Sequence, residues 1–470
     1  GVKGVVLSGG PSSVYEKKAP TMPLDHLPIG KIPILGICYG HQLIAYLLGG
    51  NVRRSSKGEY GKVILHISKR HILLEDIPIE SVVWMSHKDI VDKLPAGFET
   101  LGYTDNSPIA IMANDKIRVY GVQFHPEVDH TEYGMQVLKN FLYGICKCEG
   151  GWKPIDLVRD FISKHKIYSS ERALVAVSGG VDSTVTAIIL REIFKDNLYV
   201  VFIDTGLLRE NEAEYVKELF KKLKFKNFYA YDASELFLSR LRGITDPEEK
   251  RRVISDTFFE IFEKIANELR GRVGAITFLG QGTLYPDRVE SGVTSRHTDR
   301  IKSHHNVVIR RRLGFKLLEP LKDLYKDEVR EVAKHLGVPK EVYTRHPFPG
   351  PGLAIRIIGE VTKEKLSILR KADKIVEEEL RKSGLYERIW QGFPVLLSLK
   401  SVGIKGDKRS YEYIIAIRIV HSLNAMTASF VKVDWNILER IANRILNEVE
   451  GVNRVLYDVT NKPPATIEFE

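Results

Sequence analysis

The sequence is poor in cysteine and has no long hydrophobic run. Only three of its 470 residues are cysteines, Cys38, Cys146 and Cys148, which excludes a disulfide scaffold and agrees with a reducing cytoplasm. No apolar run approaches the ~18 residues of a membrane span. No signal peptide is recognisable, since Gly1 to Gly10 has the pattern of a strand that runs into a glycine turn. We therefore expect a cytoplasmic protein with no membrane partner.

A concentrated block of one charge is also missing. The chain has 70 Lys and Arg against 60 Asp and Glu, so its formal net charge is +10, and this excess is spread along the sequence. Such a balance favours anionic partners but does not separate nucleotides from nucleic acid. Hydrophobic residues make up 43% of the chain, which is enough for a core of normal size. The length suggests about three domains.

The first part of the chain alternates short apolar runs with glycine turns. Three runs read as strands: Val2 to Leu7, Ile32 to Ile37 and Val119 to Phe124. Each ends at a polar or reactive segment, which is typical of an open α/β sheet that carries a site at the carboxyl ends of its strands. The glycine pair Gly150-Gly151 marks a plausible boundary.

The rest of the chain shows two further patterns. From Ala173 onward, strands and helices alternate, which predicts a parallel, doubly wound sheet. After the Pro- and Gly-rich segment His346 to Gly352, Thr362 and Asp434 each precede an amphipathic helix, and a hairpin is expected around Lys405 to Asp407. The sequence thus predicts two doubly wound α/β domains, residues 1–149 and 150–356, and a small β-α-β-β-α-β domain at residues 357–470.

A cysteine between two glycines forms the first chemical constellation. Gly36 and Gly40 flank Cys38 in a G-x-C-x-G pattern, which lets a chain turn sharply and hold the side chain above a sheet. A helix N-terminus behind the thiol favours thiolate. His125 at another strand end is a candidate base, with Glu127 to orient it. The backbone amides of Gly10 and Tyr39 are candidates for an oxyanion hole.

An isolated buried cysteine is usually only a small hydrophobic residue. That reading is retained for Cys146 and Cys148, because no second Cys/His pair completes a zinc site. For Cys38 it is disfavoured, because three reactive features at strand ends of one sheet are improbable by chance.

These residues resemble the class I glutamine amidotransferases. The resemblance lies in Gly36 to Gln42 and in Val122 to Glu127. It implies that Cys38 attacks the side-chain amide of L-glutamine, that ammonia leaves, and that water clears a thioester, with His125 as base and Glu127 as its orienter. The family normally has an extra strand and helix before the equivalent of Gly1, so we expect an exposed sheet edge at this end.

A glycine-rich turn forms the second constellation. It joins a predicted strand to a helix start, where backbone N–H groups and the helix dipole suit an anion. It matches neither the P-loop nor the dinucleotide fingerprint, and the alternative is an ordinary glycine turn with a serine cap. The residues of this turn are Ser178, Gly179, Gly180, Val181, Asp182 and Ser183.

This turn resembles the ATP pyrophosphatase family. The resemblance implies cleavage of ATP between its α and β phosphates, with Mg²⁺ neutralising the phosphates. Asp182 and Asp204 are the acidic groups at strand ends that would help to hold nucleotide or metal, and Asp182 is the candidate Mg²⁺ ligand.

Together the two constellations imply amination of an adenylylated oxygen. Longer strings resemble the glutamine-hydrolysing GMP synthetase family; these strings are residues 204–209, 280–287, 301–306, 346–356 and 462–470. The resemblance implies that ATP adenylylates O2 of xanthosine monophosphate (XMP) and that ammonia displaces AMP at C2, giving GMP, AMP and pyrophosphate. It also implies a homodimer formed by the last domain, and no nucleic-acid partner.

The same resemblance gives candidate XMP-binding residues. Arg251 and Lys462 are cations suited to a 5′-phosphate. The segment Gly243 to Arg252, rich in charge and without apolar periodicity, predicts a mobile lid. The full set of candidates is Arg251, Gln391, Lys462, Thr466, Ile467 and Glu468.

Two other functions stay open at this stage. The first is another adenylylating enzyme, either tRNA-thiolating or NAD-synthetase-like, and the basic charge balance would suit tRNA. Against it, the Lys462 to Glu470 tail has no role there, and Cys146 and Cys148 are not placed for sulfur transfer. The second is a non-catalytic amidotransferase-like partner, which would have lost part of the Cys38, His125 and Glu127 triad.

Overall fold

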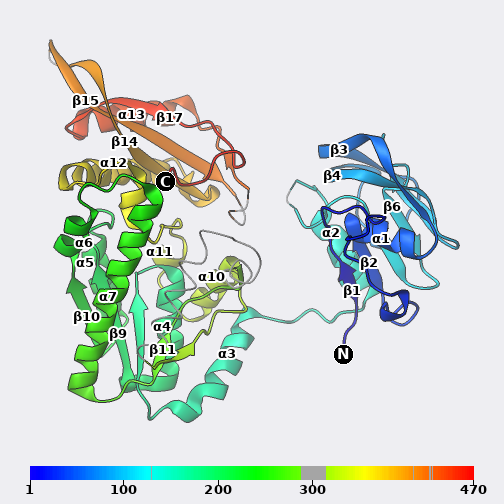
Figure 1. Cartoon of the computed structure of the whole chain (residues 1–470), viewed down its shortest axis with the longest axis horizontal. Helices are drawn as coiled ribbons and strands as arrows, with labels where there is room; N and C mark the ends of the chain where they lie inside the picture. The colour runs from blue at the N-terminus through cyan, green and yellow to red at the C-terminus, as the bar shows by residue number, and fades with distance from the viewer. Residues whose placement is uncertain (129, 287–313, 406, 423–424, 426) are drawn as a thin grey trace. The chain divides into compact units, whose positions relative to one another are not determined.

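The structure is a computed structural model of the whole chain, shown in Figure 1. It describes all residues except 129, 287–313, 406, 423–424 and 426. The chain folds into two compact units, Gly1–Trp152 and Lys153–Glu470, which we describe separately. Among the described residues, no helix is both long and apolar enough to cross a membrane.

Unit 1 contains a seven-stranded mixed sheet in the order β1-β2-β7-β6-β5-β3-β4. One side is parallel and comprises β1 (Val5–Leu7), β2 (Ile34–Ile37) and β7 (Val119–Val122). The other side is antiparallel and comprises β6 (Ile111–Asn114), β5 (Glu99–Tyr103), β3 (Asn51–Ile67) and β4 (Glu80–Lys93). The three predicted strands form the parallel side. The antiparallel side was not identified from the sequence, because its longest strand, β3, carries many exposed polar residues.

Both faces of this sheet are covered. Helix α1 (Tyr39–Leu47) buries Leu43 and Ile44 against one face. Val137 and Phe141, from α2 (Gly134–Lys139) and η3 (Asn140–Ile145), pack against the other. The 3-10 segments η1 (Leu24–His26) and η2 (Ile72–Leu74) complete the unit.

Unit 2 begins with a five-stranded, wholly parallel sheet in the order β10-β9-β8-β11-β12. Its strands are β8 (Ala173–Val177), β9 (Leu198–Asp204), β10 (Phe228–Asp232), β11 (Phe278–Gly280) and β12 (Lys316–Leu318). Five helices bury apolar residues in the core of one face: α3 (Pro154–His165), α4 (Val181–Phe194), α5 (Glu212–Lys222), α10 (Lys326–His335) and α11 (Lys340–Tyr343). Helices α6 (Ser234–Leu241) and α7 (Pro247–Val273) pack in the core of the other. The doubly wound arrangement predicted from the alternating pattern is confirmed.

The last part of unit 2 follows the predicted β-α-β-β-α-β order, with one extra short strand. The elements are β13 (Ile357–Ile358), α12 (Lys363–Lys382), β14 (Gln391–Lys405), β15 (Lys408–His421), β16 (Ser429–Phe430), α13 (Trp435–Glu448) and β17 (Val452–Tyr457). Both predicted helix caps are present, since the side chains of Thr362 and Asp434 accept hydrogen bonds from the amides of Lys365 and Asn436. β14 and β15 form the expected antiparallel hairpin.

One hydrophobic core joins the two parts of unit 2. Leu269 of α7, Leu369 of α12 and Ile415 of β15 belong to the same buried cluster. Arg356, at the boundary expected from the sequence, is fully buried. A separate domain at residues 357–470 therefore remains a proposal, because its helices share a core with the segment before it.

The prediction of a mobile lid at Gly243 to Arg252 is wrong. Residues 247–252 form the first turns of α7, where the Asp246 side chain caps the helix by accepting from the Glu249 amide. The Lys250 side chain is fully buried and donates to the carbonyl oxygen of Ile357 at 2.7 Å. The charge-rich sequence suggested an exposed, mobile segment. It did not reveal that Lys250 points inward to a partner that is distant in the chain.

Candidate functional site

Cys38 lies on a strained turn between β2 and α1. Its φ of 50° and ψ of −104° place it in a region that L-residues rarely adopt. The flanking glycines make room for the turn. A Cβ at Gly36 would lie 2.5 Å from the Gly40 carbonyl oxygen, and a Cβ at Gly40 would lie 2.1 Å from the Leu7 carbonyl oxygen. The G-x-C-x-G pattern is therefore required by backbone packing.

His125 and Glu127 follow the neighbouring strand β7. The Nδ1 atom of His125 is hydrogen-bonded to Glu127 Oε1 at 2.7 Å. A Cβ at Gly9 would lie 3.0 Å from His125 Cε1 and 3.5 Å from Cys38 Cβ, so the three residues converge. The Cys38 thiol contributes most, and Glu127 next, to raising the pKa of His125 to about 10, although burial opposes that rise. An imidazolium at neutral pH beside Cys38 is the arrangement expected of an activated cysteine.

The predicted oxyanion residues lie beside this group. A Cβ at Gly10 would lie 3.5 Å from the Tyr39 ring, so the two residues adjoin. Tyr39 is the first residue of α1, and the amides of a first helical turn have no acceptor within the helix. Both amides therefore belong to the neighbourhood of Cys38.

Sequence reasoning missed two buried amides behind the thiol. Gln123 Nε2 lies 3.8 Å from Cys38 Sγ, and Gln42 Nε2 donates to Gln123 Oε1 at 3.2 Å and to the Asp89 carbonyl oxygen at 2.8 Å. Both glutamines stand inside the strings that resemble the amidotransferases. Their burial, 3% exposed or less, is the structural signal that sets them apart.

The glycine-rich turn of unit 2 closes on itself at the start of α4. The Ser178 amide donates to Ser183 Oγ at 3.2 Å, and the Gly180 amide donates to Ser178 Oγ at 3.4 Å. Gly179 has a φ of +79°, and a Cβ there would lie 2.5 Å from Val216 Cγ2. The turn precedes a helix of 14 residues, whose N-terminus suits a phosphate.

Asp182 lies in the first turn of α4 and has one oxygen available. Its Oδ2 is paired with Lys326 Nζ, whereas its buried Oδ1 has no hydrogen-bond partner among the described residues. A buried acceptor without a donor is a suitable position for a cation. Asp204 ends β9, and its Oδ1 accepts from the Gly206 amide at 2.8 Å. No group of three or more potential metal-ligating side chains occurs in the part of the chain that the structure describes.

A pocket adjoins the Asp204 turn. It has a volume of about 390 Å³ and is lined by Asp204, Gly206, Ser234 and Arg370, among others. Two of the strings that resemble the GMP synthetase family extend beyond the described residues. Residues 301–306 lie wholly outside them, and Asp287, the last residue of the string 280–287, does too.

The six candidate XMP-binding residues gather at the C-terminal tail. Glu468 accepts two hydrogen bonds from Arg356, at 2.9 and 3.0 Å, and one from Gln391 at 2.8 Å. Arg251 donates to the backbone oxygen of Glu470. Lys462 Nζ donates to the Ala425 carbonyl oxygen at 2.8 Å.

The tail is docked rather than frayed. Arg418, fully buried, donates to the carbonyl oxygens of Thr466 at 2.9 Å and Ile467 at 3.3 Å. Thr466 Oγ1 donates to the Glu468 carbonyl oxygen, and Ile467 is buried. Sequence reasoning missed Arg418 and Arg356, whose partners are distant in the chain.

Four protein-family models match separate parts of the chain. Residues 1–145 match the family Glutamine amidotransferase class-I, and residues 378–469 match GMP synthase C terminal domain. Between them, residues 172–254 match Phosphoadenosine phosphosulfate reductase domain and residues 315–368 match NAD synthase.

Relatives match over nearly their full length. The chain is 51% identical to "GMP synthase [glutamine-hydrolyzing]" of Aquifex aeolicus over 99% of this chain and 91% of that protein. It is 50% identical to proteins of the same name from Thermosipho melanesiensis and Campylobacter hominis, over 99% and 100% of this chain and 91% of each relative. The chain belongs to the family of glutamine-hydrolysing GMP synthases, ATP-using ligases that combine a class I glutamine amidotransferase with an ATP pyrophosphatase.

Proposed function

We propose that Cys38, His125 and Glu127 carry out the glutaminase step of this GMP synthase. The Cys38 thiolate attacks the amide carbon of L-glutamine, the C–N bond breaks, and the imidazolium of His125 gives its proton to the leaving nitrogen, which departs as ammonia. Neutral His125 then takes a proton from the water that clears the thioester. Glu127 holds Nδ1 of the imidazole, and the amides of Gly10 and Tyr39 stabilise the oxyanion.

We propose that the turn of residues 178–183 binds the phosphates of ATP. Its amides and the α4 dipole offset negative charge, and Asp204 is placed at the neighbouring strand end. Mg²⁺ enters with ATP as part of that substrate, and the free Oδ1 of Asp182 fits it as one ligand. The metal neutralises phosphate charge, whereas the chain's own residues bind and orient the nucleotide.

We propose that the tail and its partners bind XMP. Arg251 and Lys462 supply positive charge for the 5′-phosphate, and Gln391, Thr466, Ile467 and Glu468 provide the remaining contacts. Glu468 supports this role because its carboxylate is held in one orientation by Arg356 and Gln391.

The remaining partners are also proposals. A second copy of the chain is the proposed partner of the hairpin end of β14 and β15, where Val402, Ile404 and Tyr411 are 60%, 76% and 66% exposed. Nucleic acid is not proposed as a partner, because the family's substrates account for the anionic preference. The cytoplasm is proposed as the compartment, and residues 1–149, 150–356 and 357–470 as the functional divisions.

The observation that carries the glutaminase assignment is the strained Cys38 turn beside a charged His125. The test supplies XMP, MgATP and either L-glutamine or ammonium, and chromatography quantifies GMP, AMP and pyrophosphate. GMP and AMP in equal amounts with both nitrogen donors are expected. Product with ammonium alone would overturn the glutaminase assignment, and no GMP with either donor would overturn the proposed site residues of unit 2.

A further inference from the structure

A buried carboxylate in unit 2 lies between two arginines from different parts of the chain. Asp373, on α12, is 5% exposed. Its Oδ2 lies 3.2 Å from Arg209 Nε, and its Oδ1 lies 3.7 Å from Arg356 Nη1. Burial raises the pKa of Asp373 and the two guanidinium groups oppose that rise, so the ionised carboxylate depends on both arginines.

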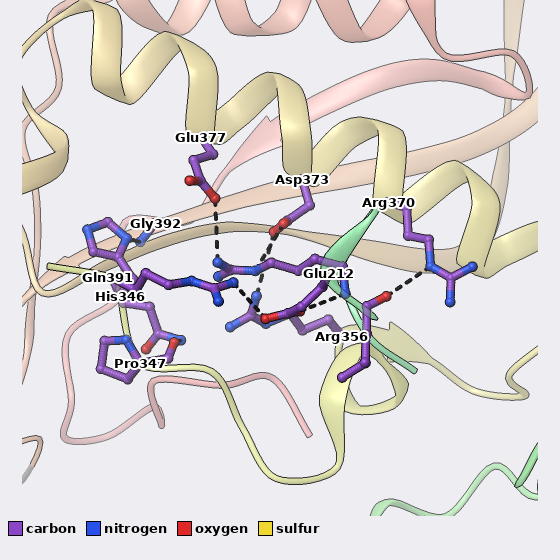
Figure 2. A network of polar contacts seen from close by, with 12 residues as sticks. Glu212, His346, Pro347, Arg356, Arg370, Asp373, Glu377, Gln391 and Gly392 are labelled. Atoms are coloured by element: carbon purple, nitrogen blue, oxygen red, sulfur yellow. Dashed lines mark hydrogen bonds and ion pairs between the residues drawn. The ribbon is translucent and has the colours of Figure 1, made fainter. Parts of the chain in front are cut away.

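The Arg209 side of this contact reaches the proposed ATP site. Arg209 lies in the loop between Asp204, at the end of β9, and the start of α5 at Glu212. The Oδ1 atom of Asp204 accepts from the Gly206 amide in this loop. On α12, one turn before Asp373, Arg370 donates to the carbonyl oxygens of Leu208 and Gly206. One face of α12 therefore contacts this loop at Gly206, Leu208 and Arg209. Figure 2 shows Arg370, Asp373 and Glu377 directed from this helix toward the loop.

The Arg356 side reaches the proposed XMP site. Arg356 is fully buried and binds both carboxylate oxygens of Glu468 through Nε and Nη2. Its third nitrogen, Nη1, faces Asp373. Glu468 and Asp373 are therefore contacted by the same guanidinium group, on opposite sides of it.

The two arginine contacts with Asp373 are ion pairs without a well-formed hydrogen bond. Arg356 Nη1 and Arg209 Nε are buried and have no hydrogen-bond partner among the described residues, although each faces an oxygen of Asp373. Both guanidinium groups lie over the same ring, Phe348, at 5.4 and 4.9 Å from its centre. Small movements of either arginine would turn its ion pair with Asp373 into a hydrogen bond.

We propose that Asp373 is a positioning residue that couples the ATP-side loop, through Arg209, to the XMP-side tail, through Arg356 and Glu468. The proposal rests on the nucleotide sites proposed above. It explains why an acid lies beside the apolar face of α12, where a hydrophobic residue would pack at lower desolvation cost.

The test measures steady-state kinetics of the full chain with ammonium as nitrogen donor, so that unit 1 is bypassed. Asp373→Asn keeps the shape and removes the charge, and we expect the KM values for XMP and for ATP to rise together, each about tenfold. Arg356→Lys should raise the KM for XMP more than the KM for ATP, and Arg209→Lys should raise the KM for ATP more than the KM for XMP, but each should change both. Glu378→Gln is the matched control, because Glu378 lies on the same helix but pairs with Arg444, and both KM values should stay at the parental level.

The outcomes separate coupling from mere stabilisation. If Asp373→Asn lowers the melting temperature but leaves either KM unchanged, the proposal is wrong. Should that variant fail to fold, the Arg209→Lys/Arg356→Lys double variant decides. If the KM for XMP of the double variant equals the product of the two single-variant effects, the coupling is overturned. A departure from that product of more than about threefold supports the coupling. If the parental chain makes no GMP, the proposed nucleotide sites fail, which is a distinct result.

Discussion

At the scale of single residues, the proposed glutaminase site depends on a charge that is held between three side chains. His125 has its pKa raised by Cys38 and Glu127, so its proton is available as the amide nitrogen leaves. Removal of either partner should therefore lower the pKa of His125 and weaken its hold on that proton.

Cys38→Ala should abolish GMP formation from glutamine and leave GMP formation from ammonium unchanged. The reason is that Cys38 belongs to unit 1, whereas the proposed ATP and XMP residues belong to unit 2. Initial rates with each nitrogen donor measure the effect, and Cys148→Ala, a cysteine outside the triad, should retain both activities. Loss of the ammonium-dependent rate in a folded Cys38→Ala chain would contradict two independent sites.

Removing either partner should lower the pKa of His125 from about 10 toward its usual 6.5. The fall should be larger in Cys38→Ala than in Glu127→Gln, because the thiol makes the larger contribution. An NMR titration of the histidine ring signals measures both values. The opposite order would mean that Glu127, rather than Cys38, holds the proton.

The same shift makes a prediction about stability. Because the folded pKa lies above the usual 6.5, the interactions of His125 stabilise unit 1 fully below pH 6.5, and that stabilisation is lost as the pH rises through about 10. In Cys38→Ala the unfolding free energy of unit 1 should therefore fall less between pH 7 and pH 10 than in the parental chain. Denaturant titrations at both pH values test this difference.

At the scale of elements, the Cys38 turn is set by close backbone contact between β1, β2 and α1. Gly40→Ala should destabilise unit 1 by about 1–3 kcal/mol or more, because the added methyl group would meet the Leu7 carbonyl oxygen. Glutamine-dependent activity should fall with it. Gly144→Ala is the matched control, since a Cβ there would make only ordinary contacts with Ile72, at 3.4 Å or more. Equal stabilities of the two variants in urea unfolding would contradict the packing argument.

The C-terminal tail is the second element with a testable role. Lys462→Ala should raise the KM for XMP about tenfold or more and leave the KM for ATP near its parental value, because it removes a charge-assisted phosphate contact. Lys432→Ala, an exposed lysine near the same sheet, is the control. If calorimetry shows an unchanged affinity for XMP, Lys462 does not bind XMP, and its role is limited to the hydrogen bond with the Ala425 carbonyl oxygen.

At the scale of the whole molecule, the exposed apolar end of the β14–β15 hairpin is the proposed contact between two copies. Val402→Asp combined with Ile404→Asp should convert a dimer to a monomer in analytical ultracentrifugation, because charge would be buried in the contact. Ile167→Asp, at an equally exposed apolar residue on η4 (Lys166–Tyr168), should leave the dimer intact. A parental chain that sediments as a monomer would reject the dimer.

Local patterns alone determined the doubly wound arrangement of unit 2, the parallel side of the unit 1 sheet, the caps at Thr362 and Asp434, and the Cys38 turn. These follow from strand and helix periodicity, from side chains that bond nearby amides, and from glycines that only a crowded turn requires. Family resemblance added Arg251 and the tail residues, whose roles remain proposals.

Only the tertiary structure decided where the buried charges lie. Lys250, Asp373 and Arg418 are charged residues that a sequence pattern places on a surface, yet each is buried against partners distant in the chain. A buried charge is tolerated only when a partner compensates its lost hydration. That partner comes from another element, so neither the burial of Lys250 in α7 nor the link from Arg209 to Glu468 can be read from local sequence.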